Sequence, residues 1–518
     1  MENLCGTKGK RRRFVTLSRR QIRSAPRIGF RLPYKADNSG FLKATRTSQN
    51  TSGIKPALVV GSDSALTAWR VTIKVGQWKR TNVLRISVDW FEGAHNAARE
   101  ERATACDFRV WITNQNVCLH VDGIDGAVYD HVTMPAYSLA EGLAHDWWTI
   151  FGSRDKEYQL IRHRMGYTTH DVRFKFDGVA FETYSCQHSY SNPGTRFWTG
   201  PTELMSRSVA ESTLAGFIDQ VITRLHEANL HGTSADLRWA RVQASRLDHD
   251  ETEFCEAAGA LGVDPYSIGE EETDFITQSA ALFNDEPRIE FLAGVPRPSL
   301  RGGTLDWIRY VESRPPYQSR LPDLASVADQ VCRATLQRSG DRSWALGYRR
   351  AGAARAVLNK KQSDRISSTG ELARALGNKS IRSAGRTSGL RALVSLFGGN
   401  VHVHLRDRPR TPEARVSELF AFTRAVGDAI CFPGTPRAVV NELHYADRQA
   451  AARAFAAEFL APINEILSMR EDDKDIATIA DEFNVSTELV ELQLVNRERI
   501  AKACDQEEQS NTEKLSAG

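Results

Sequence analysis

Alternating apolar and polar positions indicate that the first part of the chain is rich in strands. Between about residues 56 and 200, short runs of β-branched and aromatic residues are separated by turn residues. These runs are "AWRVTIKV", "LRISVDWF", "FRVWIT" and "VCLHVDG". The segment "VRFKFDGVAFETYS" predicts a hairpin with Asp177-Gly178 at its turn. Between the strands, the apolar spacing of residues 139–152 predicts one helix, anchored by the tryptophan pair within it.

The pattern becomes helical after residue 200. From Ser208 to Asn229, apolar residues recur at i, i+3, i+4 and i+7, which predicts an amphipathic helix. A second helical run, "SADLRWARVQASRLDHDETEFCEAAGALG", ends in a glycine suited to a helix C-cap. The acidic stretch "GEEETD" fits a helix N-terminus, where negative charge favours the helix dipole. Residues 293–320 are rich in Pro, Gly and Arg, which predicts a linker between two halves.

The C-terminal part reads as a strand, two helices and a final helix pair. "GNVHVHLRDRP" alternates like a strand at a sheet edge. The following helix has Thr411 as its expected N-cap and Pro412 at its first position. An alanine-rich helix, "YADRQAAARAFAAEFLAP", is stopped by Pro462. Last, "DIATIADEFNVSTELVELQLVNRERI" predicts a helix, a turn and a second helix with Ser486 as N-cap.

Together these elements predict an α+β protein. It would have a strand-rich N-terminal domain, a helical middle and a mainly helical C-terminal domain with a small sheet. The 518 residues suffice for several cores, and the apolar (41%) and charged (25%) contents are ordinary for globular proteins. No apolar run is long enough for a membrane helix, and no apolar segment follows the basic N-terminus as in a secretory signal.

The cysteines predict the redox environment of the protein. All eight are scattered, without a C-x-x-C pair, which argues against a disulfide framework or a zinc knuckle and favours a reducing cytoplasm. Cys186 and His188 are two residues apart, but no orienting partner accompanies them. We therefore expect a structural cysteine there.

Positive charge is concentrated at the N-terminus. The segment from Lys8 to Arg27 is almost free of acidic residues, although the net charge of the whole chain is only +4. Like charge and low hydrophobicity predict a disordered tail over residues 1–55. Such an arm would bind nucleic acid with salt-dependent, sequence-independent affinity, and a solvated tail without a ligand is the alternative.

Three C-terminal segments occur in an order that resembles a family of zinc peptidases. "FAFTRAVGDA", "QAAARAFAAEFLAP" and "IADEFNVSTELVELQL" follow one another between about residues 390 and 500. They resemble the R-F-T-L-A-H-E-L-G-H helix, the E-x-x-A-N-x-F-A-A-x-L-L-M-P helix and the closing F-x-V-S helix pair of the ImmA/IrrE metallopeptidases. The resemblance implies a zincin-like fold in about a fifth of the chain. It also implies a link to the cleavage of mobile-element repressors or stress regulators.

The positions that bind zinc in this family carry other residues here. Aligning the shared glycine at Gly427 places Arg424 and Asp428 where the two histidines belong. Ala425 then replaces the catalytic glutamate, and Gln449 replaces the third ligand. An H-E-x-x-H helix needs both histidines on one face to reach the metal, and the glutamate as general base. The resemblance thus implies the fold without its zinc chemistry.

Arg424 and Asp428 are spaced i, i+4 on one helix face. A guanidinium and a carboxylate can pair at this spacing. We predict that this ion pair fills the former metal site and that the buried cation would repel Zn²⁺. The alternative is an ordinary surface salt bridge on an unrelated helix.

The first hypothesis is therefore a catalytically inactive protein that keeps the fold and has lost the zinc site. The second hypothesis is a zinc site at another position. His402 and His404 alternate on one strand and therefore share a face. With Glu442 and His444, which are likewise two apart in an expected loop, they would supply three or four ligands, as zinc enzymes use. The protein would then be an active zinc metallo-endopeptidase that cleaves a regulator, whereas the first hypothesis requires no cofactor. No glutamate is placed on a helix as the general base of such a site.

A third hypothesis is a DNA-binding regulator that uses the C-terminal helix pair as a helix-turn-helix. Its second helix is acidic and apolar, whereas recognition helices present Arg, Lys, Asn or Gln to the groove. Glu488 and Glu491 would meet phosphate unfavourably. The basic N-terminal arm is the better candidate for a nucleic-acid contact.

The expected organisation follows from these boundaries. It comprises a basic tail (1–55), a strand-rich domain (56–200), a helical region (201–292), a linker (293–320), an ImmA/IrrE-like domain (321–500) and a second disordered tail (501–518). The expected function is that of a catalytically degenerate, cytoplasmic regulatory or protein-binding module in phage, mobile-element or stress regulation. We expect a protein partner and no membrane contact.

Overall fold

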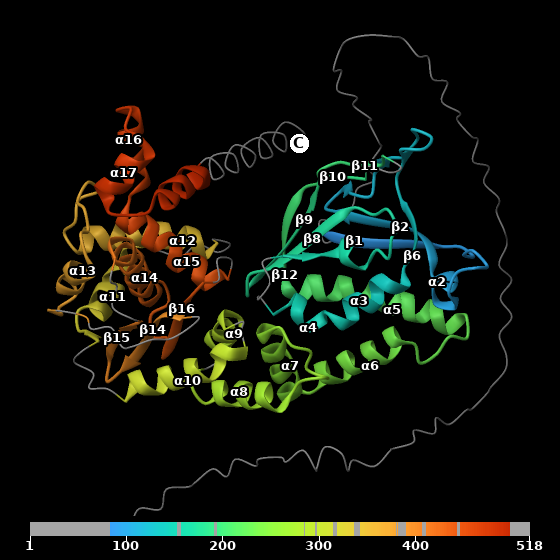
Figure 1. The fold of residues 1–518 in the computed structure, drawn as a ribbon, viewed down its shortest axis with the longest axis horizontal. Coiled ribbons are helices and arrows are strands. Elements are labelled where there is room, and N and C mark those ends of the chain that lie inside the picture. The colour runs from blue at the N-terminus through green and yellow to red at the C-terminus, as the bar shows by residue number, and fades with distance from the viewer. Residues whose placement is uncertain are drawn as a thin grey trace, which may run out of the picture. The chain divides into compact units, whose positions relative to one another are not determined.

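The computed structural model describes the chain in segments. These are residues 83–152, 157–190, 194–283, 285–295, 298–313, 319–335, 342–379, 381, 390–406, 411–442 and 446–497. Both predicted tails and the predicted strand "AWRVTIKV" lie outside them. The described residues combine helices with small antiparallel sheets, which confirms the predicted α+β class (Figure 1).

Up to residue 206, the described residues form three antiparallel sheets. Their strand orders are β1-β2-β3 with β6 beside β2, β10-β11-β4-β5, and β12-β9-β8-β7. The strands are β1 (Leu84–Trp90), β2 (Ala105–Ile112), β3 (Gln115–Asn116), β4 (His120–Val121), β5 (Val128–Tyr129), β6 (Val132–Pro135), β7 (Tyr158–Gln159), β8 (Asp171–Phe176), β9 (Ala180–Cys186), β10 (His188–Ser189), β11 (Arg196–Phe197) and β12 (Thr202–Ser206).

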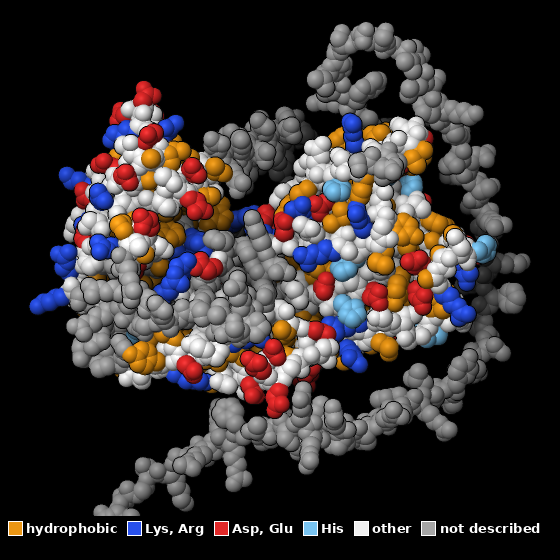
Figure 2. All heavy atoms as spheres, viewed as in Figure 1, with side chains coloured by type: hydrophobic (Ala, Val, Ile, Leu, Met, Phe, Trp, Pro, Cys, Tyr) orange, Lys and Arg blue, Asp and Glu red, His pale blue; other side chains and the backbone are white. Residues whose placement is uncertain are grey.

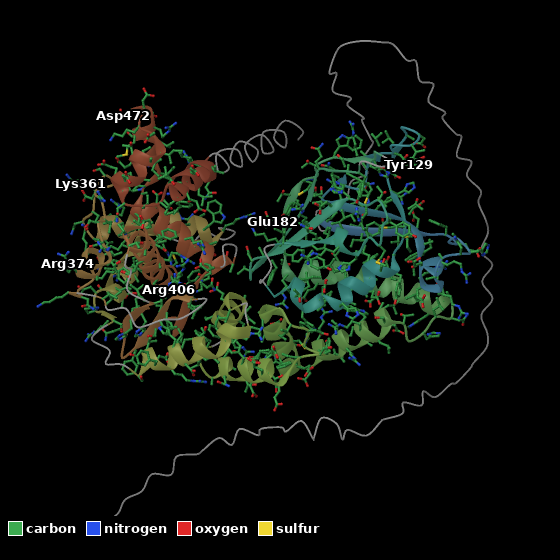
Figure 3. The ribbon with its side chains drawn as sticks, viewed as in Figure 1. Tyr129, Glu182, Lys361, Arg374, Arg406 and Asp472 are labelled. Atoms are coloured by element: carbon green, nitrogen blue, oxygen red, sulfur yellow. The ribbon has the colours of Figure 1, made fainter. Side chains whose placement is uncertain are left out.

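The predicted hairpin is confirmed. Strands β8 and β9 pair in the register that places Phe176 opposite Phe181, and Gly178 takes a φ of +99° in the turn. The phenylalanines point into the core, since alternate residues of a strand lie on opposite faces. On the other face, the ammonium of Lys175 lies 3.5 Å from the carboxylate of Glu182 (Figure 3).

Two predicted helices are each divided in the structure. The helix predicted over 139–152 forms as α3 (Tyr137–His145) and α4 (Trp147–Ile150), and both of its tryptophans are buried. The second long helical run forms as α6 (Ser234–Leu247) and α7 (His249–Leu261). Asp248 divides it because its carboxylate accepts hydrogen bonds from the backbone of Asp250 and Glu251, which starts a new helix.

One hydrophobic core joins the N-terminal strands to the helices that follow them. Phe108 and Phe174 of the sheets share it with Phe217 of α5 (Arg207–Glu227) and Trp239 of α6. The predicted boundary at residue 200 therefore does not separate two cores. Two short elements, α2 (Arg99–Ala103) and the 3₁₀ helix η1 (Leu160–His163), complete this region.

The prediction of a linker over residues 293–320 is wrong for residues 298–312, which form helix α10 (Pro298–Glu312). Leu305, Ile308 and Val311 of α10 are buried in a core shared with α8 (Glu270–Ala280), α9 (Asp285–Gly294) and strands of the C-terminal sheet. The two glycines that suggested a break, at 302 and 303, lie where an added Cβ would meet no atom. They occupy an exposed helix face. The predicted acidic helix start is confirmed in the first turn of α8.

The C-terminal region surrounds a four-stranded antiparallel sheet of order β13-β15-β14-β16. Strand β15 lies inside this sheet, because β13 pairs with it, and is not the edge strand that its sequence suggested. The strands are β13 (Arg320–Leu321), β14 (Leu390–Phe397), β15 (Asn400–Leu405) and β16 (Arg437–Asn441). The helices are α11 (Leu324–Ala334), α12 (Ser343–Val357), α13 (Thr369–Ala375), α14 (Pro412–Cys431), α15 (Asp447–Leu460), α16 (Ile463–Glu471), α17 (Ile476–Phe483) and residues 487–497.

Local signals set the ends of these helices as predicted. The Thr411 hydroxyl accepts the backbone N–H of Ala414 at the start of α14, and α15 ends before Pro462. The Ser486 hydroxyl accepts the backbone N–H of Leu489 in the last helix. None of the helices that the structure describes combines the length and apolarity needed to cross a bilayer.

The packing of α12 on α15 predicts opposite effects for two glycine substitutions in one helix. A Cβ at Gly347 would lie 2.3 Å from the backbone oxygen of Ala451, whereas a Cβ at Gly352 would meet nothing within 4 Å. We expect Gly347→Ala to destabilise the protein by about 1–3 kcal/mol. Gly352→Ala should stabilise it by about 0.5–1 kcal/mol, because alanine favours the helix. Urea unfolding of both variants measures this difference, and equal effects would contradict the close contact.

Candidate functional site

Helices α14 and α15 are in close contact at Gly427. An added Cβ there would lie 2.5 Å from Cδ1 of Phe455, which is completely buried. The glycine on which the family alignment rests therefore has a packing role: it lets the two helices come together. Of the predicted site positions, Arg424 lies about one turn before Gly427 on α14, Asp428 directly follows it, and Gln449 lies on α15, six residues before Phe455.

Arg424 is buried and reaches across to α15 (2% exposed). Its Nη2 donates to Oε1 of Gln449 at 2.7 Å and to the backbone oxygen of Asn441 at 2.9 Å. Burial, followed by the nearby charge of Arg453, holds the pKa of Arg424 well below its usual range. Two of the four predicted site positions thus meet directly.

Both the oxygen and the nitrogen of the Gln449 carboxamide form hydrogen bonds. Its Oε1 accepts from Arg424 and from the backbone N–H of Asn441, at 3.3 Å. Its Nε2 donates to the backbone oxygen of Val439 at 2.7 Å and to the carboxylate of Glu290 at 3.1 Å. A glutamate at this position would lose both donated hydrogen bonds and face the Glu290 carboxylate. The neutral amide therefore fits these surroundings better than the family's third zinc ligand would.

The predicted ion pair between Arg424 and Asp428 is wrong. Asp428 pairs instead with Arg448 of α15, through bonds of 2.6 Å (Nε to Oδ1) and 2.8 Å (Nη2 to Oδ2). Both side chains are buried. Arg448 also donates to the hydroxyl of Thr435 at 3.2 Å, and its guanidinium lies 4.6 Å from the ring centroid of Phe432.

The physical reason is geometric. An i, i+4 pair shares only one helix face, whereas a guanidinium on a facing helix can approach a carboxylate with two parallel N–H bonds. Arg448 has this position relative to Asp428, and Arg424 points toward β16 and Gln449. Charged groups do occupy these positions, but the carboxylate of Asp428 pairs with Arg448 and not with Arg424.

Ala425, at the position of the catalytic glutamate, belongs to the apolar core of the C-terminal region and is fully buried. A glutamate there would be a carboxylate among apolar side chains. Arg424 and Arg448 bring cations where a zinc site needs lone pairs. The four residues at the aligned positions do not fit a zinc ion.

The alternative metal ligands are placed only in part. His402 and His404 lie on β15, both buried, with ring centroids 6.4 Å apart, which confirms that they share a face. Nδ1 of His402 lies 3.2 Å from the Ser319 hydroxyl. Of their predicted companions, Glu442 pairs with Arg391, and His444 lies outside the described residues. Within the described segments, no three His, Cys, Asp or Glu side chains group as metal ligands. The relocated site remains a prediction.

Cys186 and His188 fall on different strands, at the end of β9 and in β10. Burial raises the pKa of the Cys186 thiol, although the charge of Arg173 opposes this shift. A raised pKa is the opposite of the activation that a nucleophilic cysteine needs.

Sequence reasoning missed three members of the network: Arg448, Asn441 and Glu290. A weak signal was available for Arg448, because a cation in the first turn of a helix opposes the dipole and so suggests a carboxylate partner. Glu290 had none, since it comes from α9, 159 residues before Gln449.

Comparisons with family models, with curated proteins and with solved structures give no match for this chain.

The buried ion pair predicts a large cost for Asp428→Asn. The substitution leaves the buried guanidinium of Arg448 without its carboxylate, which typically costs about 3–5 kcal/mol. The matched control is Asp306→Asn, which breaks the exposed pair between Asp306 and Arg309 and should cost less than about 1 kcal/mol. Urea unfolding checks both values. Costs that agree within 1 kcal/mol would mean that the Asp428 pair is not a structural contact.

Proposed function

We propose that the C-terminal region is a peptidase-like fold that has lost its zinc chemistry and acts as a regulatory or protein-binding module. The observation that carries this proposal is the network of Arg424, Gln449, Asp428 and Arg448. These side chains stand at or beside the positions that the ImmA/IrrE resemblance assigns to the metal, and Arg424 is hydrogen-bonded to Gln449 and Arg448 to Asp428.

The order of elements supports the resemblance. The hairpin of β14 and β15 is followed by α14, by strand β16 and by α15, and then by the helices that carry the "FNVS" segment. Two residues that the alignment makes equivalent to ligands, Arg424 and Gln449, are hydrogen-bonded across α14 and α15.

The chemistry of the network supports a role without catalysis. Hydrolysis at a zinc centre needs an open coordination position and a general base. Here Arg424 and Asp428 are 2% and 1% exposed, and Ala425 is in the core. Strand β16 and helix α9 close the network through Asn441 and Glu290.

The partner that we propose is a protein, met in the cytoplasm. On the face shown in Figure 2, acidic and basic side chains are interspersed over the C-terminal region, unlike the single-sign stripe of a nucleic-acid site. Free cysteines in the described residues agree with a reducing compartment. Any nucleic-acid contact is proposed for the basic segment Lys8–Arg27, which lies outside the described residues.

Metal content tests the proposal. We expect the purified full chain to hold less than about 0.1 zinc per molecule by elemental mass spectrometry, because cations occupy the aligned positions. A variant that carries Arg424→His, Ala425→Glu, Asp428→His and Gln449→Glu should regain about one zinc if the alignment is right. Arg448→Met is added, since this guanidinium would otherwise lose its carboxylate.

The control is the same variant with Arg424 retained, which lacks one ligand and should stay free of zinc. Circular dichroism establishes that both variants are folded. One zinc per wild-type chain would overturn the proposal of a lost metal site. A folded restoration variant that binds no zinc would overturn the family assignment itself.

A further inference from the structure

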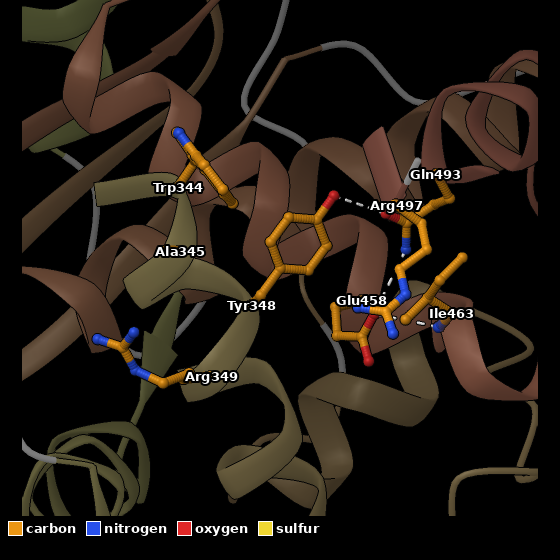
Figure 4. Close-up of a pocket in the computed structure, with 8 residues that line it drawn as sticks. All are labelled: Trp344, Ala345, Tyr348, Arg349, Glu458, Ile463, Gln493 and Arg497. Atoms are coloured by element: carbon orange, nitrogen blue, oxygen red, sulfur yellow. Dashed lines mark hydrogen bonds between the residues drawn. The ribbon is translucent and has the colours of Figure 1, made fainter. Parts of the chain in front are cut away.

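A pocket separate from the buried network lies between α12, α15, the start of α16 and the last helix (Figure 4). Its volume is about 240 Å³, which suits one side chain or a small molecule better than a larger ligand. The residues that line it are Trp344, Ala345, Tyr348, Arg349, Glu458, Ile463, Gln493 and Arg497. Neither the family alignment nor the proposed function assigns it a role.

The carboxylate of Glu458 is the acidic group of this pocket. Its Oε2 accepts the backbone N–H of Ile463 at 3.1 Å and Nε2 of Gln493 at 3.5 Å. Gln493 is held in turn by the Tyr348 hydroxyl, which donates to its Oε1 at 2.7 Å (Figure 4). The chain of hydrogen bonds fixes Glu458 toward the pocket from two helices.

Glu458 has no cationic partner at ion-pair distance among the described residues. The charge of Arg355 acts on it, but Arg355 donates its hydrogen bonds to backbone oxygens, including those of Lys361 and Asp364. Burial raises the pKa of Glu458 to about 7, against the opposing effect of its hydrogen bonds and of Arg355. A cationic group of a ligand would offset the cost of burying the charged carboxylate, since an opposite charge favours its ionised form.

Two aromatic rings line the same pocket as this carboxylate, and Tyr348 lies between Trp344 and Glu458 in Figure 4. Trp344 and Tyr348 are one helical turn apart on α12, with ring centroids 6.1 Å apart and an interplanar angle of 84°. With two rings at this angle, an ammonium group can lie over the face of one ring while an apolar stem packs against the other. Ile463 adds an aliphatic wall.

We propose that this pocket binds a primary ammonium group on an apolar stem, with Glu458 as its counter-ion and Trp344 and Tyr348 around the stem. A lysine side chain and a free alkylamine share this chemistry. An anionic ligand is the rival reading because Arg349 and Arg497 also line the pocket. However, Arg497 is exposed, and Figure 4 shows the guanidinium of Arg349 pointing away from Tyr348 and Glu458.

Titration of the full chain with n-butylamine, followed by NMR, tests the proposal. Butyrate and butanol serve as comparison ligands, because they carry a negative or a neutral head group on a similar alkyl stem. We expect saturable binding of butylamine, at least tenfold tighter than that of either comparison ligand. Glu458→Gln and Trp344→Ala should each weaken binding at least tenfold. Glu471→Gln, an exposed change at the end of α16, is the matched control and should leave it unchanged.

The pH dependence gives a second readout. Tyr348 and Arg355 of α12, together with Gln493 and Arg497 of the last helix, surround the Glu458 carboxylate or act on its charge. With a pKa of about 7 this carboxylate is mostly charged at pH 8 and mostly neutral at pH 5.5, while the alkylammonium stays charged. Affinity should therefore fall roughly 30-fold from pH 8 to pH 5.5. Glu458→Gln should remove this slope.

Blocked lysine (N-acetyl-lysine methylamide) distinguishes the sources of the ammonium. Binding tighter than that of butylamine supports a lysine of a partner protein, and equal or weaker binding supports a free amine. Preferred binding of butyrate would overturn the proposal, as would the absence of saturable butylamine binding by the wild-type chain. Neither result bears on zinc content, so this proposal fails independently of the proposed function.

Discussion

The side-chain amide of Gln449 is the contact on which the C-terminal architecture depends. It joins α14 through Arg424, β16 through Val439 and Asn441, and α9 through Glu290. A buried polar group that loses its partner costs about 1–3 kcal/mol, so each of these elements is fixed by the same few atoms. Only an amide serves here, because it both donates and accepts.

The buried charges around Gln449 are compensated largely within the network itself. Asp428 and Arg448 neutralise each other in a two-bond pair that also closes the α14–α15 contact. Among the described residues, Arg424 forms no ion pair with a carboxylate; its Nη2 donates to the Asn441 carbonyl and the Gln449 amide, and its Nε has no hydrogen-bond partner. Burial opposes this charge, which is why its pKa falls. The helices can tolerate it because Gly427 lets them pack closely around the polar atoms.

Local structure was predictable from the sequence, and the partners of the site were not. The β8–β9 hairpin and the cap of α14 follow from residues within a few positions of one another. The partner of Asp428 depends on how α15 packs on α14. The spacing of residues along one helix carries no information about that packing. The same limit explains the missed contact of Glu290. The predicted linker failed for a different reason, because composition hid the apolar spacing of α10.

The coupling within the network also bears on how a zinc site would be lost or regained. A carboxylate at position 449 would face Glu290 and give up the bond to Val439, and a histidine at 428 would leave Arg448 buried without its counter-ion. Each single reversal therefore costs stability before any metal could compensate for it. A zinc site at these positions would therefore need Gln449, Asp428 and Arg448 to be replaced together.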